Sequence, residues 1–560
     1  IAIDTFDVSA LILIYKCLGS LSSEPTMSLS HPRASFSRAC VTRQDLIRLR
    51  QEIEEGVAEK RITPTEMDKF DPEDMRYGPS VHTICEQYIK PVTAQAGNAS
   101  WAFALHPEGS ECDLFISHCW AEGVFELIDK VLVSWPRGAQ HAYCCLLANP
   151  QNLDVSGLLS NPIDSPFAQA LSSAKWVLVV PNRKCSIYSR IWCTYEAYLA
   201  YKWRKRILTA SSPSSGMAWR VLALVSFWIL VLTSVIACIE HSPHLLTPFA
   251  TKIVKVATNV LPPFSVSAKN QIAVHIINYV AMFLWGLNRG AIFHRRVFES
   301  DEFLSNHPST WSILFYVAWA FEIVAVCAIS EIDCVSCADE ELESKQLLNG
   351  YSGHVMDAKS SVQRDADRIK EEIRERHEEH AVDRAVDILI KAGMSTPQLQ
   401  EAEAWGVDTA GAAHRNYSKL CLCLAWWFHM SVWLYHTGGT QGTWTFAKTE
   451  AIFAFILGLI FVAVLIRLPR DDRRFATKAA SIFIFPCILL YVIFVVYEAG
   501  NGTLRNDFAD VVFISLIACL AAPLTLGVSL IGPAALCRVP VCGVALTSLI
   551  VGADISQCEV

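Results

Sequence analysis

The chain divides into two parts by its pattern of hydrophobic and polar positions. From about Pro25 to Arg206, charged residues and prolines interrupt short apolar runs, as they do in globular domains. After the Ser- and Pro-rich stretch 211–216, apolar runs recur that are close to the length needed to cross a ~30 Å hydrocarbon core. They lie at 221–239, 272–287, 311–329, 420–435, 451–466, 480–497 and 511–531, with a weaker run at 534–551. The pattern predicts an all-α multi-pass transmembrane bundle of seven or eight helices.

Composition supports a membrane protein with soluble parts. Hydrophobic residues make up 52% of the 560 residues, charged residues make up 18%, and the mean hydropathy is +0.31. Soluble domains carry about a quarter charged residues. The net charge of −8 offers no basic surface for nucleic acid, and the 20 cysteines are too dispersed for a disulfide framework. We therefore expect an integral, multi-pass membrane protein whose partner is the lipid bilayer and that binds no nucleic acid.

Basic residues set the expected orientation of these spans. Arg204, Lys205 and Arg206 precede the first apolar run, and the positive-inside rule then places the N-terminal part in the cytosol. Arg296 and Arg467 also favour the inside, yet three candidate spans separate them. The number and parity of the spans, the side of the polar segment 330–418 and the membrane concerned therefore stay open.

The same patterns divide the chain into segments. The apolar stretch 10–15 is too short for a signal peptide, and Met27 is a candidate for the true start. We expect a poorly ordered N-terminal extension (1–32), a helical or irregular lead-in (33–106), an α/β domain (107–210), a hinge (211–219), transmembrane helices 1–3 (220–329), a polar helical insertion (330–418), transmembrane helices 4–8 (419–551) and a tail (552–560).

Polar residues interrupt two of the apolar runs. Glu322 lies within 311–329, and an intramembrane carboxylate is costly, so by default it indicates an ion path or a polar partner. His275 and Asn278, three residues apart on one helical face of the second run, are the candidate partners. A transport function would depend on these three residues.

Two motifs in the polar insertion have partial metal-site spacing. His377 and His380 are three residues apart in a strongly charged helical stretch, and Cys334 and Cys337 have no second cysteine pair. A solvated helical face accounts for the two histidines. The two cysteines could form a redox pair or half a zinc site, but without a second pair they indicate neither, so we expect no metal site.

Strands and helices alternate before the hinge. Apolar runs rich in β-formers predict strands at 113–118, 142–148, 176–180 and 207–209, and helical spacing predicts helices at 122–133, 165–171 and 189–203. This alternation indicates a parallel sheet that is covered on both faces. Ligands of such sheets bind beyond the carboxyl ends of the strands, here at 117–120, 149–151 and 182–184.

Three motifs in this segment resemble TIR (Toll/interleukin-receptor-type) domains. Residues 113–118 read DLFISH and are similar to the opening strand of that family, and 167–171 with 177–180 is similar to its helix-then-strand segment. Residues 189–196 read SRIWCTYE and resemble the S-x-W-C-x-x-E signature, with one extra residue between Ser and Trp. The loop 118–121 and the stretch after the second strand depart from the family pattern. The resemblance covers less than a fifth of the chain and implies a flavodoxin-like, TIR-like α/β domain.

The resemblance implies two alternative activities. Some TIR domains are signalling scaffolds that self-associate, and others hydrolyse NAD at the nicotinamide–ribose bond with the glutamate of the signature, which is Glu196 here. That chemistry is reasonable, because a carboxylate stabilises the oxocarbenium character that develops on the ribose. NAD would be a substrate, and no resident cofactor is expected.

Helical spacing gives an independent argument about Glu196. Trp192, Glu196 and Leu199 lie on one stripe of the predicted helix, so the carboxylate faces inward with large apolar side chains. An inward carboxylate must be paired or must line a polar cleft, and its pKa is raised if that cleft is dry. A catalytic role and a structural hydrogen bond remain alternatives.

Four further residues are candidates for binding the substrate. His118 could also act as a general acid, whereas packing against the following helix is the alternative for Trp120. The candidate substrate-binding residues are Ser117, His118, Trp120 and Trp192.

Two functions from different classes follow. The first, which we expect, is a multi-pass membrane protein presenting a cytosolic TIR-like signalling domain, with NAD cleavage through Glu196 undecided. The second is a channel or transporter-like protein in which a non-catalytic TIR-like domain regulates the membrane helices. Release of nicotinamide from NAD supports the first function, and Glu322-dependent ion flux supports the second.

Overall fold

The computed structural model describes most of the N-terminal half and parts of the C-terminal half. The described residues are 37–213, 216–241, 254, 257, 260–266, 270–298, 310–360, 362–409, 412, 417–425, 456, 458–467, 475–480, 482–484, 527–528, 530–540 and 542–552. The predicted extension 1–32 lies outside them, as does the predicted tail 552–560 except for residue 552.

A six-stranded, mostly parallel sheet forms the centre of the α/β part. Its strands are β1 (Val41–Thr42), β2 (Leu114–Ser117), β3 (His141–Cys144), β4 (Trp176–Val179), β5 (Arg206–Thr209) and β6 (Met394–Ser395). They lie in the order β1-β3-β2-β4-β5-β6, with parallel pairing from β3 to β5 and an antiparallel strand at each edge. The chain goes from β2 outward to β3, then crosses back to β4, so the strand order reverses between β2 and β4. In doubly wound sheets this switch point is where ligands bind.

Helices cover both faces of the sheet. On one face, α6 (Val124–Ser134) packs with α2 (Arg43–Ala58). The crossovers to β4 and β5 run in the opposite direction, so α8 (Pro166–Ser173) and α9 (Ile191–Lys202) cover the other face. Short elements connect these layers: α3 (Val81–Ile84), the π-helix η3 (Cys85–Ile89), α4 (Lys90–Gln95), α5 (Trp101–Leu105), α7 (Cys145–Ala148) and the 3₁₀ turns η4 (Ser156–Leu159), η5 (Pro162–Asp164) and η6 (Ile187–Ser189).

Local sequence explains where the main helices begin. Thr42 and Asp45 form a reciprocal capping box at the start of α2, and Ser165 caps α8 just before its proline. Gly123 precedes α6 where a Cβ atom would lie 2.1 Å from the Tyr77 carbonyl oxygen, so only glycine fits this close approach.

The polar segment after residue 349 belongs to the α/β part. It contains η7 (Val355–Asp357), α15 (Gln363–Glu375), α16 (Glu379–Ala392), β6 and α17 (Pro397–Ala404), and α16 packs directly on α9. Lys359 pairs with Arg190 at the start of α9, since Ile191 N–H donates to the Lys359 carbonyl at 3.0 Å. The sheet therefore includes a strand that follows β5 only after a long excursion of the chain.

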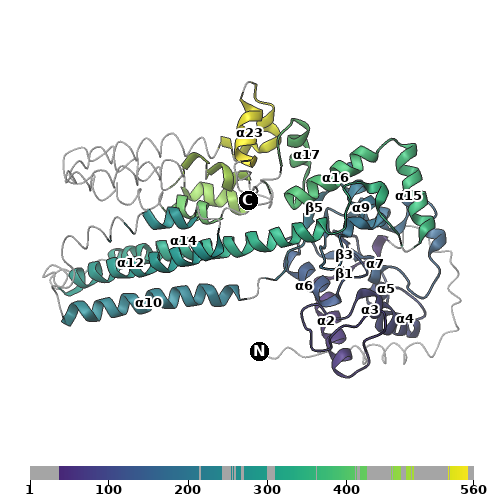
Figure 1. The fold of residues 1–560 in the computed structure, drawn as a ribbon, viewed down its shortest axis with the longest axis horizontal. Coiled ribbons are helices and arrows are strands. Elements are labelled where there is room, and N and C mark those ends of the chain that lie inside the picture. The colour runs from purple at the N-terminus through teal and green to yellow at the C-terminus, as the bar shows by residue number, and fades with distance from the viewer. Residues whose placement is uncertain are drawn as a thin grey trace.

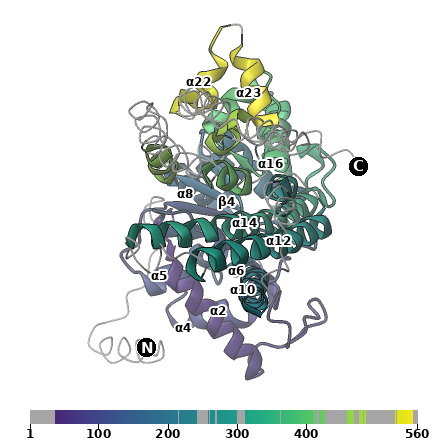
Figure 2. The ribbon, with the colours of Figure 1, turned by 90° about the vertical axis from the view of Figure 1, so that its left-hand side faces the viewer.

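Three long helices extend side by side away from the sheet (Figures 1 and 2). They are α10 (Met217–His241), α12 (Gln271–Phe298) and α14 (Thr310–Leu348), and each contacts the other two. Gly286 and Gly290 of α12 lie one turn apart against Val231 and Val235 of α10, where added Cβ atoms would come within 2.7 Å of valine side chains. Two further short helices, α22 (Pro533–Cys537) and α23 (Gly543–Gly552), lie near α17.

A buried lysine joins α14 to the sheet. Lys130 Nζ donates to Glu126 Oε1 at 2.9 Å, to the Pro181 carbonyl at 2.6 Å and to Gln346 Oε1 at 3.2 Å. The C-terminal end of α14 is therefore anchored beside the end of β4.

The predicted fold class is wrong, because the described residues form a six-stranded, mostly parallel α/β sheet with helices and do not form the expected bundle of seven or eight transmembrane helices. Among the described residues, one helix, Met217–Ile239, is long and apolar enough to cross a membrane, and 28% of its most apolar window is buried. The predicted localisation as an integral multi-pass membrane protein is wrong for the same reason.

The individual runs explain this error. The run 311–329 is part of α14, which continues through Glu331, Asp333 and Glu343. The run 272–287 is part of α12, which continues through Arg295 and Arg296 to Phe298. The weak run 534–551 is divided between α22 and α23. The runs 420–435, 480–497 and 511–531 lie largely outside the described residues. The described part of the run 451–466 includes the short apolar helix Gly458–Arg467.

Candidate functional site

Ser117 and Glu196 meet at the switch point of the sheet. Ser117 is the last residue of β2, Glu196 lies in the middle of α9, and both are buried. Ser117 Oγ donates a hydrogen bond of 2.6 Å to Glu196 Oε2. Burial raises the pKa of Glu196 to about 7 despite this bond, since desolvation disfavours the charged carboxylate. The Glu196 carboxyl group can therefore gain or lose a proton near neutral pH.

His118 forms a second buried cluster beside this pair. Its Nδ1 lies 3.0 Å from Glu122 Oε1, and its Nε2 faces the thiols of Cys144 at 3.5 Å and Cys145 at 3.2 Å. Burial raises the pKa of Glu122 to about 7, against the effect of the His118 bond, and Glu122 Oε2 has no hydrogen-bond partner. Glu122 was not among the site residues predicted from the sequence, although its position four residues after His118, in the loop that follows a buried strand, was a usable signal.

The two candidate tryptophans lie in different surroundings. Trp120 Nε1 donates to Cys145 Sγ at 3.4 Å, and its ring lies 5.3 Å from the His82 ring. Trp192 packs against Phe167 at 5.1 Å between ring centroids, and its Nε1 donates to Asp365 Oδ2 at 3.3 Å. The structure therefore groups Trp120 with His118, and Trp192 with Glu196.

The hollow next to Glu196 is small and apolar. Its walls come from α8, the Ser165 cap before it and α9, including Phe167, Leu171, Trp192 and Leu199, and it has no room for a water molecule. Sites for ligands of drug or cofactor size have volumes of about 300–1,000 Å³. His118 and Trp120 are not among its lining residues. In this conformation Glu196 is closed off from any dinucleotide.

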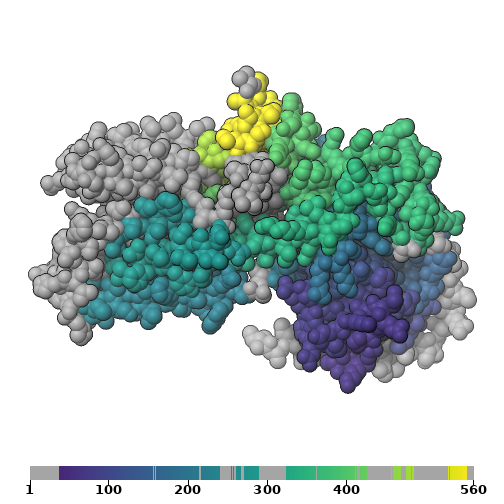
Figure 3. Space-filling model, viewed as in Figure 1, coloured from purple at the N-terminus to yellow at the C-terminus, as the bar shows by residue number. Residues whose placement is uncertain are grey.

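Helices α15 and α16 pack against the outer face of α9. In the space-filling view their green surface lies directly above the blue and purple surface of the N-terminal part of the chain (Figure 3). Tyr195 OH donates to Glu372 Oε1 at 2.8 Å, and the Tyr198 hydroxyl bonds to Glu378. Burial, together with the bond to Glu372, raises the pKa of Tyr195. Acidic side chains of α15 and of the turn after it therefore accept hydrogen bonds from tyrosine hydroxyl groups on α9.

His275 and Asn278, which were predicted to be partners of Glu322, contact Glu331 of α14. Asn278 Nδ2 donates to Glu331 Oε1 at 2.9 Å, and His275 Nδ1 lies 3.2 Å from the same oxygen. The side chain of Glu322 lies outside the described part of the structure. Glu331 is therefore the carboxylate that joins α12 to α14 at this point.

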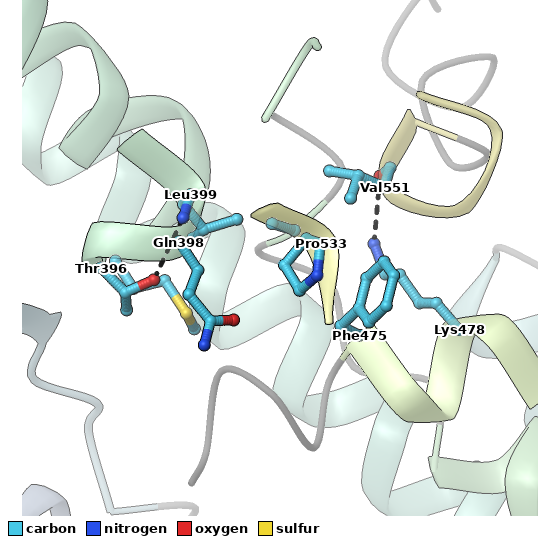
Figure 4. Close-up of a pocket in the computed structure, with 9 residues that line it drawn as sticks. Thr396, Gln398, Leu399, Phe475, Lys478, Pro533 and Val551 are labelled. Carbon is cyan, nitrogen blue, oxygen red and sulfur yellow. Dashed lines mark hydrogen bonds between the residues drawn. The ribbon is translucent and has the colours of Figure 1, made fainter. Parts of the chain in front are cut away.

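A second small hollow lies between α17 and the C-terminal helices (Figure 4). Its volume of about 20 Å³ is enough for one water molecule, and most of its lining is apolar. Lys478 is turned toward the Val551 carbonyl, 3.5 Å away, and Gln398 Oε1 has no hydrogen-bond partner. The hollow is far too small for an organic ligand.

Neither a metal centre nor a related protein identifies the site. Within the described residues, no group of three or more His, Cys, Asp or Glu side chains is placed to hold a metal ion. Comparison of the chain with protein-family models, with curated proteins and with solved structures finds no match.

Proposed function

We propose that the α/β part is a TIR-like signalling domain that acts by association, including association with further copies of itself, and not by turnover. The supporting observation is the closure around Glu196. Its carboxyl group is bonded to Ser117, is buried, and adjoins a hollow without room for water. A carboxyl group held in this way stabilises the junction of β2 and α9 and has no access to a substrate.

A second candidate function is cleavage of NAD at the nicotinamide–ribose bond. It is favoured by the location of Glu196 at the switch point and by its pKa of about 7. For this activity α8 and α9 must separate and open a cavity of at least about 300 Å³. The carboxylate would then stabilise positive charge on the ribose, and Ser117 would hold the carboxylate in position.

An assay of nicotinamide release from NAD by the full chain separates the two functions. Glu196→Gln is compared with Glu343→Gln, because Glu343 is also a buried carboxyl with a pKa raised to about 7, but it lies on α14 and accepts its hydrogen bond from the Ser212 backbone N–H and not from Ser117. Association without turnover predicts that the wild type and both variants release no more nicotinamide than a blank. Release that is lost in Glu196→Gln and kept in Glu343→Gln would establish the second function instead.

Self-association is measured separately by sedimentation of the full chain over a range of concentrations. The proposal predicts a mass that rises with concentration toward that of a dimer or larger assembly. A monomer at every concentration contradicts self-association.

A further inference from the structure

Two cysteines face each other across the switch point. Cys119 follows β2, Cys185 lies in the loop after β4, and their Sγ atoms are 3.8 Å apart. Hydrogen bonds within the loop fix the position of Cys185, because Asn182 Oδ1 accepts from the backbone N–H groups of Lys184 and Cys185. The pair therefore joins the two loops that border the carboxyl end of the sheet.

The two thiols differ in exposure and charge. Cys119 is buried, whereas Cys185 is partly exposed. The pKa of Cys185 is lowered, first by the hydrogen bond from the Cys119 thiol and further by the positive charges of Arg190 and Lys184, against the effect of partial burial. The thiolate is the nucleophilic form of cysteine, and partly exposed thiolates beside a second cysteine are the ones that oxidise reversibly.

A second close cysteine pair differs from Cys119 and Cys185 in its exposure to solvent. Cys40 and Cys112 also interact with each other, but both are buried, and the interaction and burial raise the pKa of Cys40. Neither cysteine of that pair is exposed to solvent.

We propose that Cys185 is an oxidisable thiol that reacts with a peroxide and is then resolved by Cys119 into an intrachain disulfide. The Cys185 thiolate attacks one oxygen of hydrogen peroxide, the O–O bond breaks, and a sulfenic acid and hydroxide form. The Cys119 sulfur then attacks the sulfenic sulfur, its proton and the sulfenic hydroxyl leave as water, and the S–S bond forms. Two thiols are oxidised and one peroxide is reduced.

The bridge requires only a small movement. A disulfide has an S–S bond of about 2.05 Å, so the two sulfur atoms must approach by about 1.8 Å. Ser186, the residue after Cys185, donates its backbone N–H to the Asn349 carbonyl at 2.6 Å and its hydroxyl to the Leu347 carbonyl. Oxidation therefore acts directly on the contact between this loop and the end of α14.

The test is peptide mapping of the full chain after treatment with hydrogen peroxide and alkylation of the remaining thiols. We expect a linked pair of peptides containing Cys119 and Cys185, lighter by two hydrogens than the sum of the reduced peptides. Cys334→Ser, which removes a half-buried cysteine of α14, is the matched control and should keep the bridge.

Two variants separate the two steps. Cys119→Ser should lose the bridge and leave a sulfenic acid on Cys185 that dimedone traps, and Cys185→Ser should lose both the bridge and the trapped product. Circular dichroism spectra equal to that of the wild type show that both variants fold. Full alkylation of Cys119 and Cys185 after peroxide treatment of the wild type, or a disulfide from Cys185 to a different cysteine, overturns the proposal.

Discussion

Replacing Glu196 by glutamine tests whether burial of this carboxyl group governs the pH dependence of stability. Burial raises its pKa from the ordinary 4.5 to about 7. Between these two values the folded protein binds more protons than the unfolded chain, so the free energy of unfolding falls as the pH rises from about 4.5 to about 7. The loss is complete about one pH unit above the folded-state pKa, near pH 8, and is constant beyond it.

The size of the effect follows from the shift. One pKa unit corresponds to 1.36 kcal/mol, so ionisation of Glu196 costs the folded state roughly 3 kcal/mol at pH 8 compared with pH 4. Glutamine keeps an oxygen that accepts the Ser117 hydrogen bond but cannot ionise. The difference in free energy of unfolding between Glu196→Gln and the wild type should therefore change by roughly 3 kcal/mol between pH 4 and pH 8. The change makes the variant relatively more stable at the higher pH.

Urea titrations at pH 4 and pH 8 measure this gap, with hydrogen exchange of peptides from β2 and α9 as the readout of the α/β part. Glu122 and Glu343 titrate over the same range, but they do so in both proteins and cancel in the comparison. Glu371→Gln, at an exposed position of α15, is the control and should follow the wild type at both pH values. An equal gap at the two pH values would refute the assignment of a raised pKa to Glu196.

Two further substitutions test the scaffold around the site. Lys130→Met leaves the Glu126 carboxylate buried without its cation and should lower the free energy of unfolding by about 3–5 kcal/mol in urea titration, whereas no loss would show that the pair contributes nothing. Gly123→Ala places a Cβ atom 2.1 Å from the Tyr77 carbonyl oxygen and should cost about 1–3 kcal/mol or more through backbone displacement, and an unchanged thermal midpoint would contradict that contact.

The local elements between 113 and 210 could be predicted from the sequence. Continuous apolar runs predicted strands where β2 and β4 are found, and the Ser165 cap with its proline predicted the start of α8. The expected strand 142–148 is shorter, because the chain turns into α7 after Cys144. The meeting of Glu196 with Ser117 agrees with the predicted inward position of that carboxylate.

The edges of the sheet could not be predicted. β1 and β6 have two residues each, which is too short for any alternation to be recognised, and their pairing depends on contacts distant in sequence. One signal of the covering segment was available, because α9 has Tyr195 and Tyr198 outside the stripe of Trp192, Glu196 and Leu199, at positions where a solvated helix would have charges. A helix that is apolar on all sides is buried on all sides.

The membrane prediction failed for a related reason. Counting apolar runs measures hydrophobicity alone, whereas α14 continues a hydrophobic stretch into residues such as Glu331 that bond to a neighbouring helix. Length and continuity of each helix, which determine whether it can cross a bilayer, are not contained in such a count.

The late position of β6 in the chain has a consequence for biosynthesis. β5 ends at Thr209, but the strand that pairs with its outer edge begins at Met394, beyond α10, α12 and α14. During translation the ribosome must therefore produce the long apolar helices while the hydrogen-bonding groups along that edge still lack their partner strand. Unpaired strand edges promote aggregation, so the nascent chain is expected to need chaperone protection until about residue 400 has emerged from the exit tunnel.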